Sequence, residues 1–178
     1  MTRTRYKVLD NTYPYLLTAT VIEWLPLFSN PVVVQIVMNA MQFMQDQKRM
    51  RIYGYVIMHN HLHMIASAEK LSKEFGEFKS FTARQMIDYY QAENKTTVLK
   101  KLAFFKAMHR TDRPYQFWQE GNKPKQIDRD EVMIQKLEYV HYNPVRSGFV
   151  ALPEHWRYSS ARNYLGQEGL IPVCMDWS

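Results

Sequence analysis

Cysteine is nearly absent from this chain, since Cys174 is the only one among 178 residues. A single thiol excludes an intramolecular disulfide framework and a cysteine-rich zinc site, so we expect the cytoplasm as the compartment. Long apolar runs are lacking too, because no window reaches the roughly 18 consecutive apolar residues that span a membrane. Residues 1–11 contain no apolar stretch of the kind found in secretory signals. We therefore expect no association with a membrane.

Linkers and excess acidic charge are lacking as well. The sequence contains no Gly/Ser-rich linker, internal repeat or low-complexity tract, so residues 1–178 are predicted to form one domain. A hydrophobic fraction of 46% is enough for a sizeable core and excludes overall disorder. The 23 Lys and Arg residues outnumber the 17 Asp and Glu residues, which gives a formal net charge of +6. This balance favours an anionic partner, with nucleic acid as the first candidate.

Hydrophobic periodicity predicts an alternation of strands and helices. The predicted strands are 15–24, 51–58, 61–67 and 115–119, with His59 and Asn60 in a tight turn between the second and third. Helices are predicted over 31–49 and 71–91, and a third helix is predicted after a break at Asn94. A fourth helix is predicted from a capping Asp128 to Asn143, where Pro144 ends the helix. This order predicts an α+β, ferredoxin-like split βαβ fold, with an antiparallel sheet, helices on one face and one additional helix.

Two histidines occupy alternate positions of a predicted strand. Because the side-chain period of a strand is two, His61 and His63 point to one face, about 7 Å apart along the backbone, and Leu62 points into the core. Such a pair is close enough to bind one metal ion. The alternative is an exposed polar strand face with two incidental imidazoles. His59 lies in the predicted turn and is less suited as a ligand.

A second pair of polar residues lies on the last predicted helix. Tyr139 and Asn143 are four residues apart and are therefore neighbours on one face. Tyr139 lies away from the apolar stripe that Met133, Leu137 and Val140 form. The alternative is a surface tyrosine that covers neighbouring apolar groups.

Four ordered stretches carry a family resemblance: 54–65 (GYVIMHNHLHMI), 117–121 (FWQEG), 138–148 (EYVHYNPVRSG) and 158–164 (YSSARNY). In this combination the chain resembles the REP-associated tyrosine transposases, relatives of the insertion-sequence transposases within the HUH group of single-strand endonucleases. The family-like core spans about residues 13–165. The chain departs from many family members at His59, where they have proline, and Asn143 takes a place that glutamine fills in the insertion-sequence relatives.

The resemblance implies a role for each matching residue. His61, His63 and Asn143 would bind Mg²⁺ or Mn²⁺, and Tyr139 would be the nucleophile. If a Tyr139→Phe variant still formed a covalent adduct with DNA, Tyr142 would be the first residue to test in its place. The implied activity is metal-dependent nicking and strand transfer of single-stranded DNA, through a 5′-phosphotyrosine intermediate, on hairpin-forming or palindromic DNA. The family includes dimers, so a homodimer is compatible with the resemblance, and Tyr139 would act in cis or in trans.

Basic side chains are the candidate DNA contacts, although each group could equally be a solvated face. They are Arg3 and Arg5 in an amino-terminal arm, a second concentration around residue 100, and two lysines before the last helix: Lys100, Lys101, Arg110, Arg113, Lys123 and Lys125. Two other function classes stay open. One is a non-catalytic nucleic-acid-binding module with structural histidines. The other is a small-molecule metallohydrolase, which would need a further carboxylate near His61.

Overall fold

The computed structural model describes residues 10–107, 111–121 and 123–177. Its centre is a four-stranded antiparallel sheet with the order β2-β3-β1-β4. The strands are β1 (Tyr15–Thr20), β2 (Arg51–Ile57), β3 (His61–Ser67) and β4 (Lys125–Gln126). Met58 N–H donates to the carbonyl of His61, so the predicted tight turn at residues 59 and 60 is present. This architecture confirms the predicted α+β, ferredoxin-like fold.

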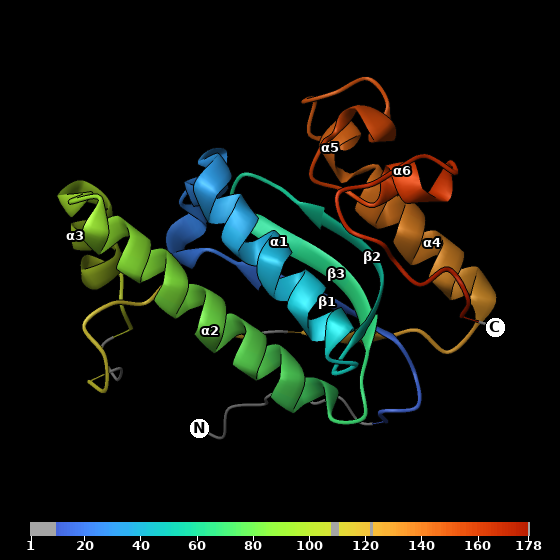
Figure 1. The fold of residues 1–178 in the computed structure, drawn as a ribbon, viewed down its shortest axis with the longest axis horizontal. Helices are drawn as coiled ribbons and strands as arrows, with labels where there is room; N and C mark the ends of the chain where they lie inside the picture. Colours follow the sequence, from blue (N-terminus) through green and yellow to red (C-terminus); the bar gives the residue numbers. More distant parts are fainter. Residues whose placement is uncertain (1–9, 108–110, 122, 178) are drawn as a thin grey trace.

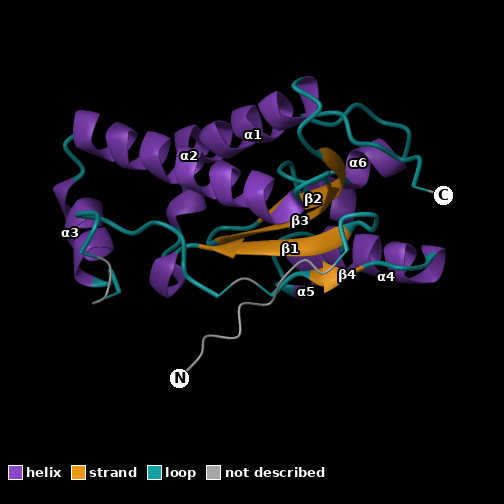
Figure 2. Ribbon diagram, turned by 90° about the horizontal axis from the view of Figure 1, so that it is seen from below, coloured by secondary structure: helices purple, strands orange, loops and turns teal. Residues whose placement is uncertain are grey.

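Helices cover both faces of the sheet (Figures 1 and 2). Across one face lie α1 (Pro31–Asp46) and α2 (Leu71–Ala92), and α3 (Thr96–Phe104) follows α2 after the break at Asn94. The other face carries α4 (Asp130–His141), which the short helix α5 (Asn143–Arg146) follows, and the short helix α6 (Ala161–Tyr164) lies beside β2 (Figure 2). No helix of the described residues is long and apolar enough to cross a membrane.

The prediction of helices on one face only is wrong, because the strands have two apolar faces. The larger core joins α1 and α2 to residues such as Leu17, Leu62 and Met64. A smaller core on the opposite face contains apolar strand residues together with the predicted stripe of α4: Leu16, Val56, Ile65, Met133, Leu137 and Val140. Burying this second face requires a helix of its own.

Two predicted strands are corrected. The strand 15–24 ends at Thr20, because the chain turns into the 3₁₀ helix η1 (Ile22–Trp24), where Glu23 and Trp24 have positive φ angles of 50° and 55°. Residues 115–119 do not form a strand, since only Trp118 bridges to Val21. Gln119 N–H donates to the carbonyl of Thr20, whereas the Trp118 carbonyl accepts from the side chain of Gln116.

The predicted ends of the last helix are corrected as well. The carboxylate of Asp128 lies 3.6 Å from the guanidinium of Arg129 instead of capping the helix, and α4 begins at Asp130. At the other end α4 stops at His141, and Pro144 lies in the first turn of α5 rather than after the last turn of α4. Proline has no N–H to continue the α4 hydrogen bonds, but the first turn of a new helix does not need that donor.

The carboxyl-terminal segment binds the outer edge of β2. Ser159 forms a bridge with Val56, and Ile57 N–H donates to the carbonyl of Tyr158. The Tyr164 hydroxyl donates to the carbonyl of Tyr53 at 2.7 Å. The stretch 158–164 thus covers a strand edge that would otherwise be unpaired.

Candidate functional site

The two histidines of β3 lie side by side on the face of the sheet that α4 covers. In the antiparallel register, His61 pairs with Thr20 of β1 and His63 pairs with Thr18. The imidazole centroids are 4.7 Å apart, and His63 is only 7% exposed. The predicted shared face is therefore present, and Leu62 between them is buried in the larger core.

Each imidazole has one nitrogen engaged by a neighbouring oxygen. His61 Nδ1 lies 2.7 Å from Asn60 Oδ1, and His63 Nδ1 lies 2.8 Å from Thr18 Oγ1. An amide oxygen can only accept, so His61 Nδ1 carries the proton and its Nε2 keeps a lone pair. Metal-binding histidines commonly have this arrangement, in which a second group fixes the tautomer of the ligand. The pair therefore fits a divalent metal ion through the two Nε2 atoms.

Burial keeps both imidazoles neutral. It lowers the pKa of His61 from 6.5 to about 4. Burial, with smaller contributions from the charges of His61 and Lys125, lowers the pKa of His63 to about 3. Neutral imidazoles are the protonation state that binds a metal ion, so at neutral pH the pair needs no deprotonation before it can act as a ligand.

Tyr139 reaches the histidine pair from α4. Its hydroxyl lies 3.4 Å from His63 Nε2, and the two ring centroids are 5.3 Å apart. The ring is 39% exposed, and the guanidinium carbon of Arg146 lies 5.6 Å from its centroid. The predicted position of Tyr139 outside the apolar stripe of α4 is present, and its hydroxyl faces the His63 imidazole.

Two contacts position α4 and were not predicted from the sequence. A Cβ atom on Gly54 of β2 would lie 2.6 Å from Leu137 Cδ2, so the Leu137 side chain packs directly against the strand backbone and would have to shift if residue 54 carried a side chain. The buried His141 bonds Ser160 Oγ through Nε2 at 2.9 Å, and Ser160 Oγ accepts from Tyr55 N–H. These contacts join residues about 20 to 100 positions apart, and their only signal in the sequence was that Gly54, His141 and Ser160 lie in three of the four ordered stretches.

The remaining candidates, Asn143, Tyr142 and His59, differ in how they are placed, and no hydrogen bond or ring contact of Asn143 or Tyr142 with the histidines is present among the described residues. Asn143 is half-buried at the start of α5, and its side chain forms no hydrogen bond with the described residues. Tyr142 lies between α4 and α5 and is 46% exposed. The His59 ring packs edge-on against Phe149 and Trp156, with centroids 4.6 Å and 5.4 Å away. His59 therefore belongs to an aromatic cluster beside the site.

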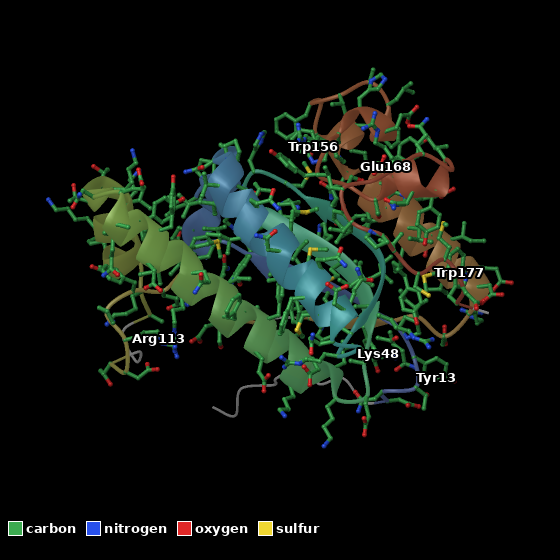
Figure 3. All side chains as sticks on the ribbon, viewed as in Figure 1. Tyr13, Lys48, Arg113, Trp156, Glu168 and Trp177 are labelled. Carbon is green, nitrogen blue, oxygen red and sulfur yellow. The ribbon has the colours of Figure 1, made fainter. Side chains whose placement is uncertain are left out.

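The predicted basic residues fall into separate groups. Lys123 and Lys125 line a pocket of about 220 Å³ with Thr18 and Thr20. This pocket opens where the chain leaves β1 after Gln119 and rejoins it at Lys125. Lys100 and Lys101 are exposed on α3, and Arg113, labelled in Figure 3, bonds the neighbouring Asp112. Arg3, Arg5 and Arg110 lie outside the described residues.

The histidines have few charged neighbours that could complete a metal site. Among the described residues, no group of three or more His, Cys, Asp or Glu side chains is placed to bind one ion. A third protein ligand beside the two imidazoles would therefore have to be an uncharged oxygen donor, such as the side-chain amide of Asn143.

The comparisons with known proteins concern the fold. No family model matches the sequence, and no curated protein does. The fold is similar to the structure of a REP-associated tyrosine transposase bound to a REP hairpin, with a TM-score of 0.66 and 16% identity over 100% of this chain and 92% of that chain. A Deinococcus radiodurans protein provisionally named a transposase gives a TM-score of 0.46 and 15% identity over 79% of this chain and 95% of that one. The predicted resemblance is thus confirmed at the level of the fold.

Proposed function

We propose that this protein is a single-strand DNA endonuclease of the tyrosine transposase type, which nicks hairpin-forming DNA through a 5′-phosphotyrosine intermediate. The observation that carries the proposal is the Tyr139 hydroxyl 3.4 Å from Nε2 of His63, in a fold shared with a hairpin-bound transposase. Structural roles alone do not require an exposed tyrosine beside two neutral imidazoles, one buried and one half-buried. Perturbed histidines next to a nucleophile are typical of catalytic sites.

Tyr139 would attack a backbone phosphorus atom. The Tyr139 oxygen forms a bond to phosphorus, the bond from phosphorus to the 3′ oxygen breaks, and that oxygen takes up a proton as it leaves. The tyrosine proton passes to water, which reaches the hydroxyl because the ring is 39% exposed. The 5′ phosphate stays linked to Tyr139, so the energy of the broken ester is retained for a later joining step and no ATP is needed.

His61, His63 and Asn143 would hold Mg²⁺ or Mn²⁺ through the two Nε2 atoms and the amide oxygen. When bound, the ion supplies Lewis-acid polarisation of the phosphodiester. The three ligands are uncharged, so they leave the charge of the ion undiminished. Thr18 and Asn60 hold the imidazoles in the required orientation. The Arg146 guanidinium lies over the Tyr139 ring and helps to hold it.

The nucleophile would act in cis. The Tyr139 hydroxyl and His63 Nε2 lie within hydrogen-bonding distance in a single chain, so the proposed site needs no tyrosine from a second copy. Lys123 and Lys125 would contact backbone phosphates, since their pocket shares Thr18 with His63. A homodimer would then bring together two separate sites.

The experiment is cleavage of an end-labelled single-stranded oligonucleotide that carries a short hairpin and unpaired flanks, with Mn²⁺ and with Mg²⁺. The native chain should cut this oligonucleotide faster than the same sequence as a duplex, because the nucleophile must reach an unobstructed phosphate. Tyr139→Phe should be inactive but still bind the oligonucleotide. Tyr142→Phe is the matched control, on a neighbouring exposed ring, and should cut normally.

Two outcomes would overturn the proposal. Binding of the hairpin without any cut by the native chain would favour the non-catalytic binding module, in which His63 and Thr18 only support the sheet. Equal cutting by Tyr139→Phe and the native chain would assign the nucleophile to another residue.

A further inference from the structure

An exposed tryptophan lies at the edge of the histidine pair. Trp24 is 57% exposed, and its indole meets the His61 imidazole edge-on, with centroids 6.0 Å apart and an interplanar angle of 73°. Among the described residues, His61 is its only aromatic neighbour. Most of the indole surface therefore faces solvent beside the position at which a phosphate would be cut.

The backbone holds this exposed ring at an energetic cost. Glu23 and Trp24 both have positive φ angles, a region that L-residues rarely adopt. Strain of this kind persists only where surrounding contacts impose it, and it is common at functional sites. Here Trp24 N–H donates to the carbonyl of Val21, and Asn60 Nδ2 donates to the Trp24 carbonyl at 3.4 Å.

Asn60 links the tryptophan to the histidine. Its side-chain nitrogen bonds the Trp24 carbonyl, and its side-chain oxygen accepts from His61 Nδ1. A single amide thus fixes both the corner that carries the indole and the tautomer of the imidazole. The two rings keep a defined relative position, as expected for two parts of one binding site.

A second exposed ring nearby is already used in packing. Phe149 stacks on Trp156 with centroids 5.7 Å apart and meets His59 edge-on. It contributes to an aromatic cluster that supports the β2–β3 turn. Trp24 has no comparable stacking partner among the described residues, so its ring face is free to accept one.

We propose that Trp24 is a stacking platform for one unpaired nucleobase next to the scissile phosphate. This inference rests on the proposed function and names a substrate contact within it. A base and its own phosphate belong to one nucleotide, so a phosphate at His61 brings an adjacent base to an indole 6.0 Å away. Stacking needs only the π-face of the base, so the platform accepts all four bases and requires an unpaired strand.

The test uses the full-length chain and synthetic hairpin oligonucleotides that carry 2-aminopurine at one unpaired flank position each. Measurements are made on Tyr139→Phe, so that the DNA stays intact. At one flank position the fluorescence should be quenched on binding. Adding Trp24→Leu should remove that quenching and weaken binding about tenfold, whereas adding Trp24→Phe should keep most of both.

Comparing leucine with phenylalanine separates stacking from space filling, because both side chains cover His61 but only phenylalanine offers a ring. The matched control is Phe43→Ala, which removes a ring of 53% exposure from α1 on the opposite face of the sheet and should change neither signal. Equal binding and quenching by the leucine and phenylalanine variants would overturn the inference. The proposed function would still hold in that case, provided that the native protein forms the covalent link between DNA and Tyr139. A native chain that neither binds nor cuts the oligonucleotide would refute the proposed function and the platform together.

Discussion

The two faces of the sheet are built from the same four strands but serve different ends. The face beneath α1 and α2 is continuously apolar and forms the larger core. The face beneath α4 is apolar only around Leu16, Val56 and Ile65, and beyond them it presents His61 and His63. Alternation along β3 places Leu62 and His63 on opposite faces, one position apart. The two histidines thus lie beyond the apolar residues that α4 covers, beside Tyr139 of the same helix.

Under the proposed function, this difference would separate the residues that stabilise the fold from those that carry the chemistry. The larger core can hold the sheet without help from the histidines, so the second face is free to carry buried neutral imidazoles. The position of α4 depends on a few contacts, namely Gly54 against Leu137 and His141 with Ser160. Changes on the two faces should therefore have separable effects.

The sharpest contrast is between two adjacent residues of β3. Leu62→Ala should lower the free energy of unfolding by about 2–5 kcal/mol, because it leaves a cavity in the larger core. His63→Ala should cost only about 1 kcal/mol of stability but reduce the cleavage rate about a thousandfold or more. Urea unfolding and oligonucleotide cleavage, measured on both variants, check this. His155→Ala, an exposed histidine of η3 (Pro153–His155), serves as the control for cleavage.

If His63→Ala cut DNA at the native rate, the division between the two faces would not hold.

A pair of glycine substitutions tests how α4 packs against β2. Gly54→Ala should destabilise the chain by about 1–3 kcal/mol and slow cleavage, because the new methyl group displaces the Leu137 side chain, whose packing helps to position α4. Gly76→Ala is the matched control within α2, where a Cβ meets nothing within 4 Å, and should stabilise by about 0.5–1 kcal/mol. Thermal unfolding ranks the two variants. Equal effects would mean that the approach of α4 to the sheet is not tight.

A smaller effect concerns pH and His141. Burial lowers its pKa from 6.5 to about 4, so between these values the unfolded chain binds more protons than the folded chain. The contribution of His141 to stability is complete above about pH 6.5 and is lost as the pH falls toward 4. From pH 7 to pH 5 this group should cost about 2 kcal/mol.

The measurement is urea unfolding of the native chain and of His141→Gln at both pH values. Since His61 and His63 titrate in both proteins, the difference between the two pH dependences isolates His141. The variant should lose less stability on acidification. An identical loss would show that the His141 imidazole is not held neutral by burial.

Much of the fold could be predicted from local patterns. The ranges of β2 and β3 agree with prediction to within one residue, because alternation and the turn at residues 59 and 60 depend on neighbours in the sequence. Periodicity likewise placed α1 and α2. The strand predicted over 115–119 is reduced to one bridge, and the Gln116 side chain bonds the Trp118 carbonyl there, a contact that residue propensity does not show.

The site was only partly predictable for the same reason. Strand alternation placed His61 and His63 on one face, and helical spacing placed Tyr139 outside the apolar stripe. The contacts that position α4 join residues 54 and 137 and residues 141 and 160, which are far apart in the sequence. Trp24 reaches His61 only through the η1 turn. No local sequence pattern contains any of these contacts. The metal-binding roles of His61, His63 and Asn143 and the nucleophilic role of Tyr139 stay predictions.

The most direct test of the account is the chemical identity of the residue that DNA becomes bound to. Native protein incubated with the hairpin oligonucleotide and Mn²⁺ is denatured, digested with trypsin and nuclease, and analysed by mass spectrometry. We predict a nucleotide joined through its 5′ phosphate to the peptide that contains Tyr139, with fragment ions that place the link on that side chain. A link to Tyr142, or a cut strand with no attached peptide, would contradict the account.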